Sequence, residues 1–118
     1  RRVTLLGFSF KPNTDDLRDA PSIDISRKLI KRGAIVTAHD PVALKNARLQ
    51  YPDLGVQYED ELEKALKEAE AIVLLTEWQD YHHINWEKVP KAIIIDGRNF
   101  LDHARLRDLG FNTTKFGK

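Results

Sequence analysis

The sequence predicts a doubly wound, mostly parallel α/β sheet with helices on both faces, folded as a single domain. Short apolar segments alternate with segments of helical periodicity along the chain, the order expected when helices connect parallel strands. Two of the apolar segments, 71–75 and 92–95, contain no polar residue, as is typical of strands that helices bury on both faces. At 118 residues the chain has the size of one domain.

The helices are predicted from their ends and from their apolar periodicity. Pro21 suits the first turn of a helix and Gly33 suits its C-terminal cap, so we expect a helix between them. In DELEKALKEAE, leucine and alanine recur at i, i+3, i+4 and i+7, which predicts an amphipathic helix. In chain order the predicted helices are 21–32, 42–51, 60–70 and 102–109.

The predicted strands are short apolar or alternating segments bounded by turn residues. In chain order they are 3–6, 34–40, 55–58, 71–75, 92–95 and 111–116. Together with the helices between them, they form the alternation of a Rossmann-like domain. No internal repeat, low-complexity stretch or linker interrupts this order.

Charge and composition argue against several classes of partner. Lys and Arg number 19 against 18 Asp and Glu, and a net charge of +1 would attract neither nucleic acid nor a membrane surface. The absence of cysteine excludes disulfides and thiolate sites, and it is compatible with the cytoplasm, where we expect the protein to work. The chain begins in a strand-like segment and contains no methionine, so we expect a fragment of a longer protein.

Polar residues are concentrated where the predicted strands end. In a parallel α/β sheet, ligands bind outside the carboxyl ends of the strands, where the loops converge. We therefore expect the candidate site in the segments that follow four of the strands, and we expect these segments to share one edge of the sheet. They are 7–21, 39–41, 76–78 and 96–99.

The first of these segments, GFSFKPNTDDLRDAP, lacks the repeated glycines of a dinucleotide-binding loop. It carries Lys11 instead, beside a helix N-terminus that can receive phosphate oxygens. Arg98 follows another strand of the same sheet, and Gly97 lets a ligand approach the backbone there. Two cations on one edge favour an anionic ligand.

Several residues of this edge have a structural and a functional interpretation. The acidic residues of 7–21 are expected to pair with Lys11 and Arg18 in a surface loop. Asp40 is either a turn or cap residue before Pro41, which we slightly favour, or the carboxylate that binds a ribose after a second strand.

The aromatic residues of this edge also have two interpretations, and the histidines nearby have one. Phe8 and Phe10 are either core residues or a platform for a nucleobase, and an aromatic ring beside a cation suits the second role. His82 and His83 have no third ligand at a useful spacing, so we predict no metal site. The two tryptophans are expected to pack in the core. No Ser, His and Asp set indicates nucleophilic catalysis, and we predict no catalytic residue.

Four segments, in this order, together resemble the C-terminal, UDP-binding domain of the UDP-glucose/GDP-mannose dehydrogenase family. They are GFSFKPNTDDLRDAPSIDI, AHDPVA, AIVLLTEW and IIIDGRN. The resemblance runs from about residue 3 to residue 117, and FKPNTDDLRDAP looks most like the members that are UDP-glucose 6-dehydrogenases. The ending TTKFGK departs from the Gly-x-Gly-Arg-like segment with which the family often closes.

The resemblance implies that this chain is the UDP-binding part of a longer, NAD-dependent enzyme that oxidises the C6 hydroxyl of a nucleotide sugar to a carboxylate. Phe10 and Lys11 match the family's FK pair, which contacts the nucleotide, and Arg98 matches the DGR arginine on the same ligand. Arg18 matches the arginine that reaches the NAD held by the N-terminal domain. The family's catalytic cysteine and Gly-rich loop are absent, so the isolated chain is expected to have no dehydrogenase activity.

The expected partner is therefore a UDP-sugar, UDP-glucose first, and the full-length enzyme is expected to be a homodimer or a higher homo-oligomer. Two function classes stay open: the substrate-binding part of a nucleotide-sugar dehydrogenase, and a structural or interaction module that binds no nucleotide. Within the first class, a related UDP-N-acetylhexosamine or GDP-mannose dehydrogenase is the alternative. An independent NAD-binding domain is disfavoured by the missing glycines.

Overall fold

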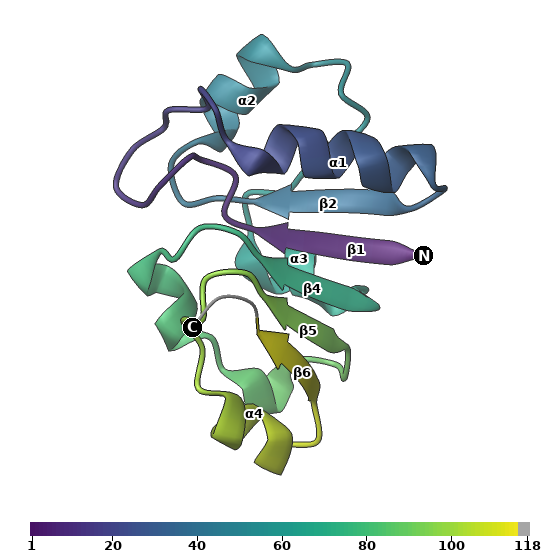
Figure 1. Ribbon diagram of the computed structural model, residues 1–118, viewed down its shortest axis with the longest axis vertical. Coiled ribbons are helices and arrows are strands. Elements are labelled where there is room, and N and C mark those ends of the chain that lie inside the picture. The colour runs from purple at the N-terminus through teal and green to yellow at the C-terminus, as the bar shows by residue number, and fades with distance from the viewer. Residues whose placement is uncertain (116–118) are drawn as a thin grey trace.

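Six strands and four α-helices alternate along the chain in the computed structural model, which describes residues 1–115 (Figure 1). The strands are β1 (Arg2–Leu6), β2 (Ile35–His39), β3 (Gln57–Tyr58), β4 (Ala71–Leu74), β5 (Ile93–Asp96) and β6 (Asn112–Lys115). The helices are α1 (Pro21–Lys31), α2 (Leu44–Gln50), α3 (Leu62–Lys67) and α4 (His103–Asp108), with 3-10 helices η1 (Gln79–His83) and η2 (Trp86–Lys88).

All strand pairs of the sheet are parallel, and the strand order is β3-β2-β1-β4-β5-β6. Leu6 at the end of β1 lies opposite His39 of β2 on one side and Leu74 of β4 on the other. The strand order therefore reverses direction between β1 and β4, which is where ligands bind in doubly wound sheets. The predicted fold class is confirmed, with a sheet that is parallel throughout.

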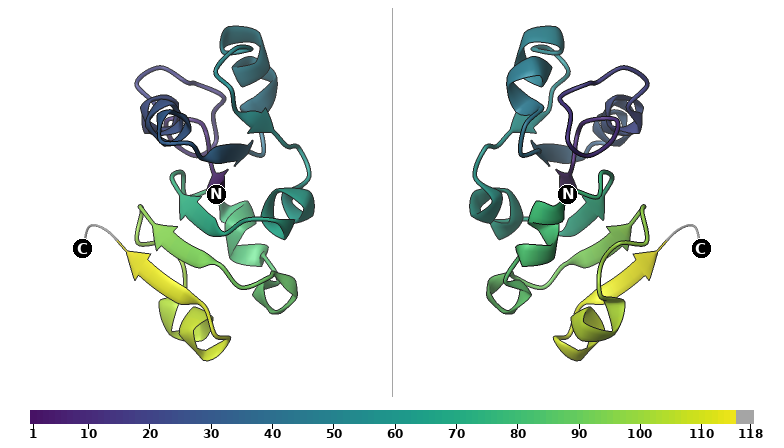
Figure 2. Two further views of the ribbon diagram at one scale, coloured as in Figure 1. Left: turned by 90° about the vertical axis from the view of Figure 1, so that its right-hand side faces the viewer. Right: turned by 90° about the vertical axis from the view of Figure 1, so that its left-hand side faces the viewer.

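Each face of the sheet has its own apolar cluster. On one face, α1 and α2 pack over β1 and β2, and the buried side chains there include Leu5, Phe8 and Val36. On the opposite face, α3, α4 and the two 3-10 helices cover Leu6, Leu74 and other residues of the central strands. The side views show α3 and the 3-10 helices across the sheet from α1 (Figure 2). Helices on both faces were predicted.

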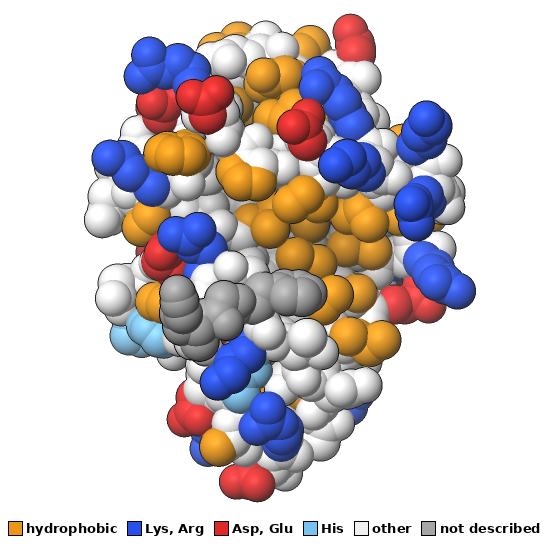
Figure 3. Space-filling view, in the orientation of Figure 1, with side chains coloured by type: hydrophobic (Ala, Val, Ile, Leu, Met, Phe, Trp, Pro, Cys, Tyr) orange, Lys and Arg blue, Asp and Glu red, His pale blue; other side chains and the backbone are white. Residues whose placement is uncertain are grey.

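The face that carries α1 is covered over only part of its area. Val3, Ala71 and Ile93 are aligned across β1, β4 and β5, and the Ile93 side chain is 49% exposed. The space-filling view shows apolar side chains side by side across the middle of this face (Figure 3). Within residues 1–115 no helix covers the β4 to β6 half of it. The fully apolar composition of β4 and β5 predicted burial on both faces, so this prediction holds only for the opposite face.

The main differences from the prediction concern helix ends and short helices. The structure begins α2 two residues later than predicted and shortens α3 at both ends. The two 3-10 helices between β4 and β5 were not predicted, because single turns carry too few residues for a periodic pattern. Trp78 and Trp86 are buried there, as expected of packing residues. The last predicted strand ends within the described part at Lys115, and residues 116–118 lie outside it.

Candidate functional site

The loops that were expected to form the site share one edge of the molecule. Because all strands run in parallel, the segments after β1, β2, β4 and β5 leave the sheet on the same side. Figure 1 shows the long loop between β1 and α1 extending beyond the arrowheads of the strands. The segment after β4 follows a strand that lies between β1 and β5. It therefore separates the segment bearing Phe10 and Lys11 from the one bearing Arg98.

Asp40 holds the base of the first loop. Its buried carboxylate accepts six hydrogen bonds from both sides of the edge. The Oδ2 atom accepts from the N–H groups of Phe8 and Ser9 at 2.7 and 3.0 Å, from the Ser9 hydroxyl, and from the Trp78 indole. The Oδ1 atom accepts from the N–H groups of Val42 and Ala43. The turn interpretation of Asp40 is therefore confirmed, and its oxygens are already saturated.

Gly7 and Thr76 bring the loops after β1 and β4 into direct contact. Gly7 has φ +90°, and a Cβ atom there would overlap the side chain of Thr76. The Thr76 hydroxyl donates to the Ser9 carbonyl at 2.7 Å, and the Ser22 hydroxyl donates to the Phe8 carbonyl at 2.6 Å. The first part of the loop is thus bound to β2, β4 and α1. A glycine is required here for close backbone approach to Thr76 rather than to a phosphate.

The side chains of the first loop divide into an inner and an outer set. Phe8 is fully buried and packs edge to face on Tyr58, so it is a core residue. Phe10, two residues later, is 49% exposed, and Lys11 is exposed beside it. The Phe10 N–H donates to the Asp16 carbonyl at 2.9 Å, which closes the loop on itself. Within residues 1–115 Lys11 forms no ion pair, so an exposed ring and an exposed ammonium stand side by side at the edge.

Asp96 shapes the turn that presents Arg98. Its buried carboxylate accepts from the N–H groups of Arg98, Phe100 and Leu101 at 2.7 to 3.0 Å. The Nε2 atom of the buried His103 ring lies 2.9 Å from the same carboxylate. Burial by itself would raise the pKa of Asp96, but hydrogen bonds from the backbone and from His103 outweigh it and lower the pKa. Asp96 is therefore a structural anion that fixes the path of the DGRN turn.

Arg98 leaves this turn and meets a carboxylate from the neighbouring loop. Its Nη2 atom lies 3.1 Å from Glu77 Oε2, and the two side chains are 49% and 30% exposed. Arg98 forms no second ion pair within residues 1–115, and its side chain is half exposed. The two cations share an edge, and the segment carrying Glu77 lies between them.

Arg18 occupies a different part of the same loop. Its guanidinium forms a fork with the Asp16 carboxylate through Nε and Nη2, at 2.8 to 3.2 Å, and the side chain is 87% exposed. This hydrogen-bonded pair lowers the pKa of Asp16 to about 2. The expected pairing of loop acids with loop cations is therefore confirmed for these two residues. Arg18 points away from the protein core and is accessible to a group outside the chain.

A buried polar pair, His39 and Tyr81, lies beside this edge, and His39 directly precedes Asp40 in the sequence. The Tyr81 hydroxyl lies 2.9 Å from His39 Nδ1 and 3.2 Å from the His39 carbonyl. Burial lowers the pKa of His39 and raises that of Tyr81, so both side chains are neutral near pH 7. Within residues 1–115 no group of three or more His, Asp or Glu side chains could hold a metal ion. Over the same residues no helix has the length and apolar character needed to cross a bilayer.

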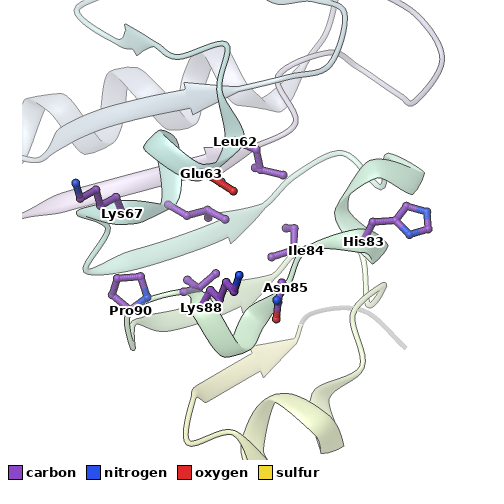
Figure 4. Close-up of a pocket in the computed structure, with 10 residues that line it drawn as sticks. Leu62, Glu63, Lys67, His83, Ile84, Asn85, Lys88 and Pro90 are labelled. Carbon is purple, nitrogen blue, oxygen red and sulfur yellow. The ribbon is translucent and has the colours of Figure 1, made fainter.

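A separate hollow of about 580 Å³ lies between α3 and the segment 83–90 (Figure 4). Leu62, Ile84 and Pro90 are among its walls, and the charged side chains of Lys67 and Lys88 stand at its rim. The hollow is lined by none of the four residues that the sequence analysis selected for ligand or cofactor binding. The candidate site is therefore the carboxyl edge of the sheet.

Glu77 is the residue of this edge to which sequence analysis assigned no role. It belongs to the predicted segment 76–78, but only the strand order places it next to Arg98. A carboxylate in the short segment that follows an apolar strand is the signal that could have selected it. Asp96 has a comparable signal, because a carboxylate followed by Gly97 and a polar turn is typical of a turn acceptor.

Comparisons with known proteins show the family of this chain. The profile of the UDP-glucose/GDP-mannose dehydrogenase family, UDP binding domain, matches residues 4–103. A UDP-glucose 6-dehydrogenase of Pseudomonas aeruginosa is 38% identical over 119 residues, which cover 94% of this chain and 26% of that protein. The chain thus spans about a quarter of the length of such relatives.

Solved structures give the same relationship. A UDP-glucose dehydrogenase from Pyrobaculum islandicum superimposes with a TM-score of 0.79 and 32% identity, over 99% of this chain and 25% of that one. An NDP-N-acetyl-D-galactosaminuronic acid dehydrogenase from Methanosarcina mazei gives a TM-score of 0.83 and 33% identity, over 99% and 24%. The profile match covers most of the chain, and the strand order, the FK loop and the DGR turn occur together in it. The chain belongs to the UDP-glucose/GDP-mannose dehydrogenase family and corresponds to its UDP-binding domain.

Proposed function

We propose that this chain binds the UDP part of a UDP-sugar and works within a longer NAD-dependent UDP-glucose 6-dehydrogenase. The observation that carries the proposal is the arrangement of the carboxyl edge. Phe10 and Lys11 stand on one side of the segment after β4 and Arg98 on the other, each on a loop that a buried carboxylate fixes. Such fixed, accessible cations beside an exposed aromatic ring suit a nucleoside diphosphate.

Each side chain has a defined part in this proposal. Lys11 is a compact cation, and Arg98 offers a planar fork that can bind two phosphate oxygens at once. The exposed Phe10 ring provides an apolar surface for the nucleobase or ribose. Asp16 forms an ion pair with Arg18. This acid therefore orders the loop and repels the phosphates less than a free carboxylate would.

We infer that the described residues, 1–115, hold no complete site for NAD. Phe8, Ser9 and Phe10 occupy the place of the glycines that let a pyrophosphate reach the backbone. The six donors on Asp40 also leave no lone pair for the ribose of a dinucleotide. We therefore place the NAD on another domain of the longer enzyme, where it would accept the hydride. Arg18 would contact that NAD across the boundary between the two domains.

Replacing Arg98 with alanine is expected to weaken UDP binding about tenfold to a hundredfold, because hydrogen bonds to charged groups contribute roughly 1.5 to 3 kcal/mol. Arg98→Lys should recover only part of this loss, since it keeps the charge but not the fork. Calorimetry with UDP measures both effects. Uridine, which lacks phosphates, should bind the wild type and the Arg98→Ala variant about equally.

A matched control for this experiment is Arg105→Ala, because Arg105 is another exposed arginine in an ion pair, with Glu87, on α4. It should bind UDP like the wild type. If the wild-type chain binds no UDP, the alternative of a structural module is supported. If UDP binds but Arg98→Ala has no effect, the phosphate role of Arg98 is refuted and the ligand occupies another place.

Arg18→Ala is expected to separate cofactor use from UDP binding. The side chain is almost fully exposed, and within residues 1–115 its hydrogen bonds and ion pair stay in its own loop, so UDP affinity of the isolated chain should change less than about twofold. In the longer enzyme, the KM for NAD should rise about tenfold, the effect of one lost charge-assisted contact. Arg27→Ala, another exposed arginine paired with a nearby acid, serves as the control. Equal losses in UDP affinity and NAD use would contradict the assignment.

The sugar is a separate question, since one solved relative is named for UDP-glucose and another for an N-acetylated galactosaminuronic acid derivative. We favour UDP-glucose, because FKPNTDDLRDAP is most similar to that group and because the P. aeruginosa relative bears that name. Turnover of the longer enzyme with UDP-glucose and UDP-N-acetylglucosamine in parallel distinguishes the two.

A further inference from the structure

Glu77 stands in the middle of the carboxyl edge, in the segment that separates the first loop from the DGRN turn. Its two neighbours fix its backbone. Thr76 is fully buried and donates to the Ser9 carbonyl, and the buried Trp78 donates from its indole to Asp40. Glu77 itself is partly exposed and turns its carboxylate toward Arg98. The position of this charge is therefore determined by the fold and not by a mobile surface segment.

Three carboxylates lie at or just after the ends of β2, β4 and β5, and they differ in their remaining capacity for hydrogen bonds. Asp40 accepts six hydrogen bonds and Asp96 accepts four, and both are buried. Glu77 is accessible, and within residues 1–115 its only partner is a single nitrogen of Arg98. The two oxygens of a carboxylate offer about four lone-pair positions, and several donors can share one of them, as at Asp40, so Glu77 with one donor keeps most of its capacity.

We propose that Glu77 is the specificity-determining residue of this edge: its carboxylate accepts hydrogen bonds from the 2′- and 3′-hydroxyls of the nucleotide ribose and disfavours phosphates that bring no ribose. The inference rests on the proposed binding of UDP. In doubly wound domains a carboxylate after the second strand has the task of binding the ribose. Here Asp40 occupies that position, but its oxygens are saturated by other donors. We therefore assign the ribose to Glu77, the accessible carboxylate after β4.

The ion pair with Arg98 explains the second half of the proposal. A phosphate that approaches Arg98 meets the negative charge of Glu77 and must share or displace it, which lowers the affinity for any simple anion. A nucleotide meets the same repulsion but also brings two hydroxyl donors to the carboxylate. Because hydrogen bonds to an ionised acceptor are stronger than neutral ones, these hydroxyls compensate for the repulsion. Glu77 thus favours binding of the nucleotide over binding of a simple phosphate anion.

The test compares UDP, 2′,3′-dideoxy-UDP and inorganic pyrophosphate on the wild type and on Glu77→Gln, by calorimetry on the 118-residue chain. In the wild type, loss of the two hydroxyls should weaken binding about tenfold. In Glu77→Gln the same loss should weaken binding less than about threefold, because a neutral amide is a poorer acceptor. Pyrophosphate should bind Glu77→Gln about threefold to tenfold more tightly than the wild type, since the repulsion is gone.

Glu87→Gln is the matched control, because Glu87 is also an exposed partner of an arginine, on η2 away from this edge. It should leave all three affinities unchanged. Glu77→Asp keeps the charge and should restore the weak binding of pyrophosphate. If removal of the two hydroxyls weakens UDP binding equally in wild type and Glu77→Gln, the role of Glu77 is overturned. It is also overturned if pyrophosphate binds both proteins with the same affinity. Failure of the wild type to bind UDP is a different result, because it overturns the proposed function itself.

Discussion

Replacing Asp40 with alanine is expected to lower the free energy of unfolding by about 3 to 5 kcal/mol, a large part of the stability of a domain of this size. Six donors lose their acceptor at once, and those of Phe8, Ser9 and Trp78 lie in or against the buried base of the first loop. A buried donor without a partner costs roughly 1 to 3 kcal/mol, although movement of the loop lets water reach some of these groups. Urea unfolding of wild type and variant measures the difference.

Asp40→Asn should be intermediate, because its carbonyl oxygen still serves one set of donors while its amide group opposes the other. Asp53→Asn is the control, since Asp53 is an exposed acid on the surface, and it should change the free energy of unfolding by less than about 0.5 kcal/mol. UDP binding should also weaken in both Asp40 variants, because Lys11 stands on the loop that Asp40 holds. An Asp40→Ala protein as stable as the control would contradict the anchoring role.

Replacing Asp96 with asparagine is expected to lower the free energy of unfolding at pH 7 by about 2 to 4 kcal/mol and to change how stability depends on pH. The folded protein lowers the pKa of Asp96, so folding favours the ionised form. The stabilisation is complete above the ordinary aspartate pKa of about 3.9, and it is lost as the pH falls through the lower pKa of the folded state. The gap between wild type and variant should therefore be widest near pH 7 and should narrow as the pH falls below about 4.

Urea unfolding of both proteins at several pH values between 7 and 2.5 tests this. Asp60→Asn is the control, because Arg48 also lowers the pKa of Asp60, but that pair lies on the surface. Its effect should stay below about 1 kcal/mol at every pH, as is usual for exposed ion pairs. A constant difference between wild type and Asp96→Asn across this range would show that the Asp96 charge contributes nothing and that only packing was lost.

The sequence predicted the sheet well because the signals for its strands are local. The uninterrupted apolar runs of β4 and β5 and the turn residues around them can be recognised in the sequence without knowledge of the fold. The 3-10 helices around Tyr81 and Trp86 have no such signal, since burial against strands distant in sequence determines their conformation. The end of α3 also depends on context, because Ala69 continues the apolar helical pattern but lies after the end of the helix, two residues before β4.

The candidate site was predictable only in part for a related reason. Lys11 and Arg98 could be placed on one edge because parallel strands share their direction. The pairing of Glu77 with Arg98 depends on β4 lying beside β5, which is a property of strand order and not of any local pattern. Asp40 shows the opposite case. The same sequence position can bind a ribose or a backbone turn, and only the six observed donors distinguish the two.

The position of β1 at the centre of the sheet also bears on how the chain is made. Among the strands of this domain, β1 is synthesised first and needs partners on both sides, β2 soon after it and β4 much later. At about 5 to 20 residues per second, the stretch from Leu6 to Leu74 takes roughly 3 to 14 s to synthesise. During that interval one edge of β1 has no strand to pair with, so a nascent chain stalled before β4 should bind chaperones more than one stalled after it.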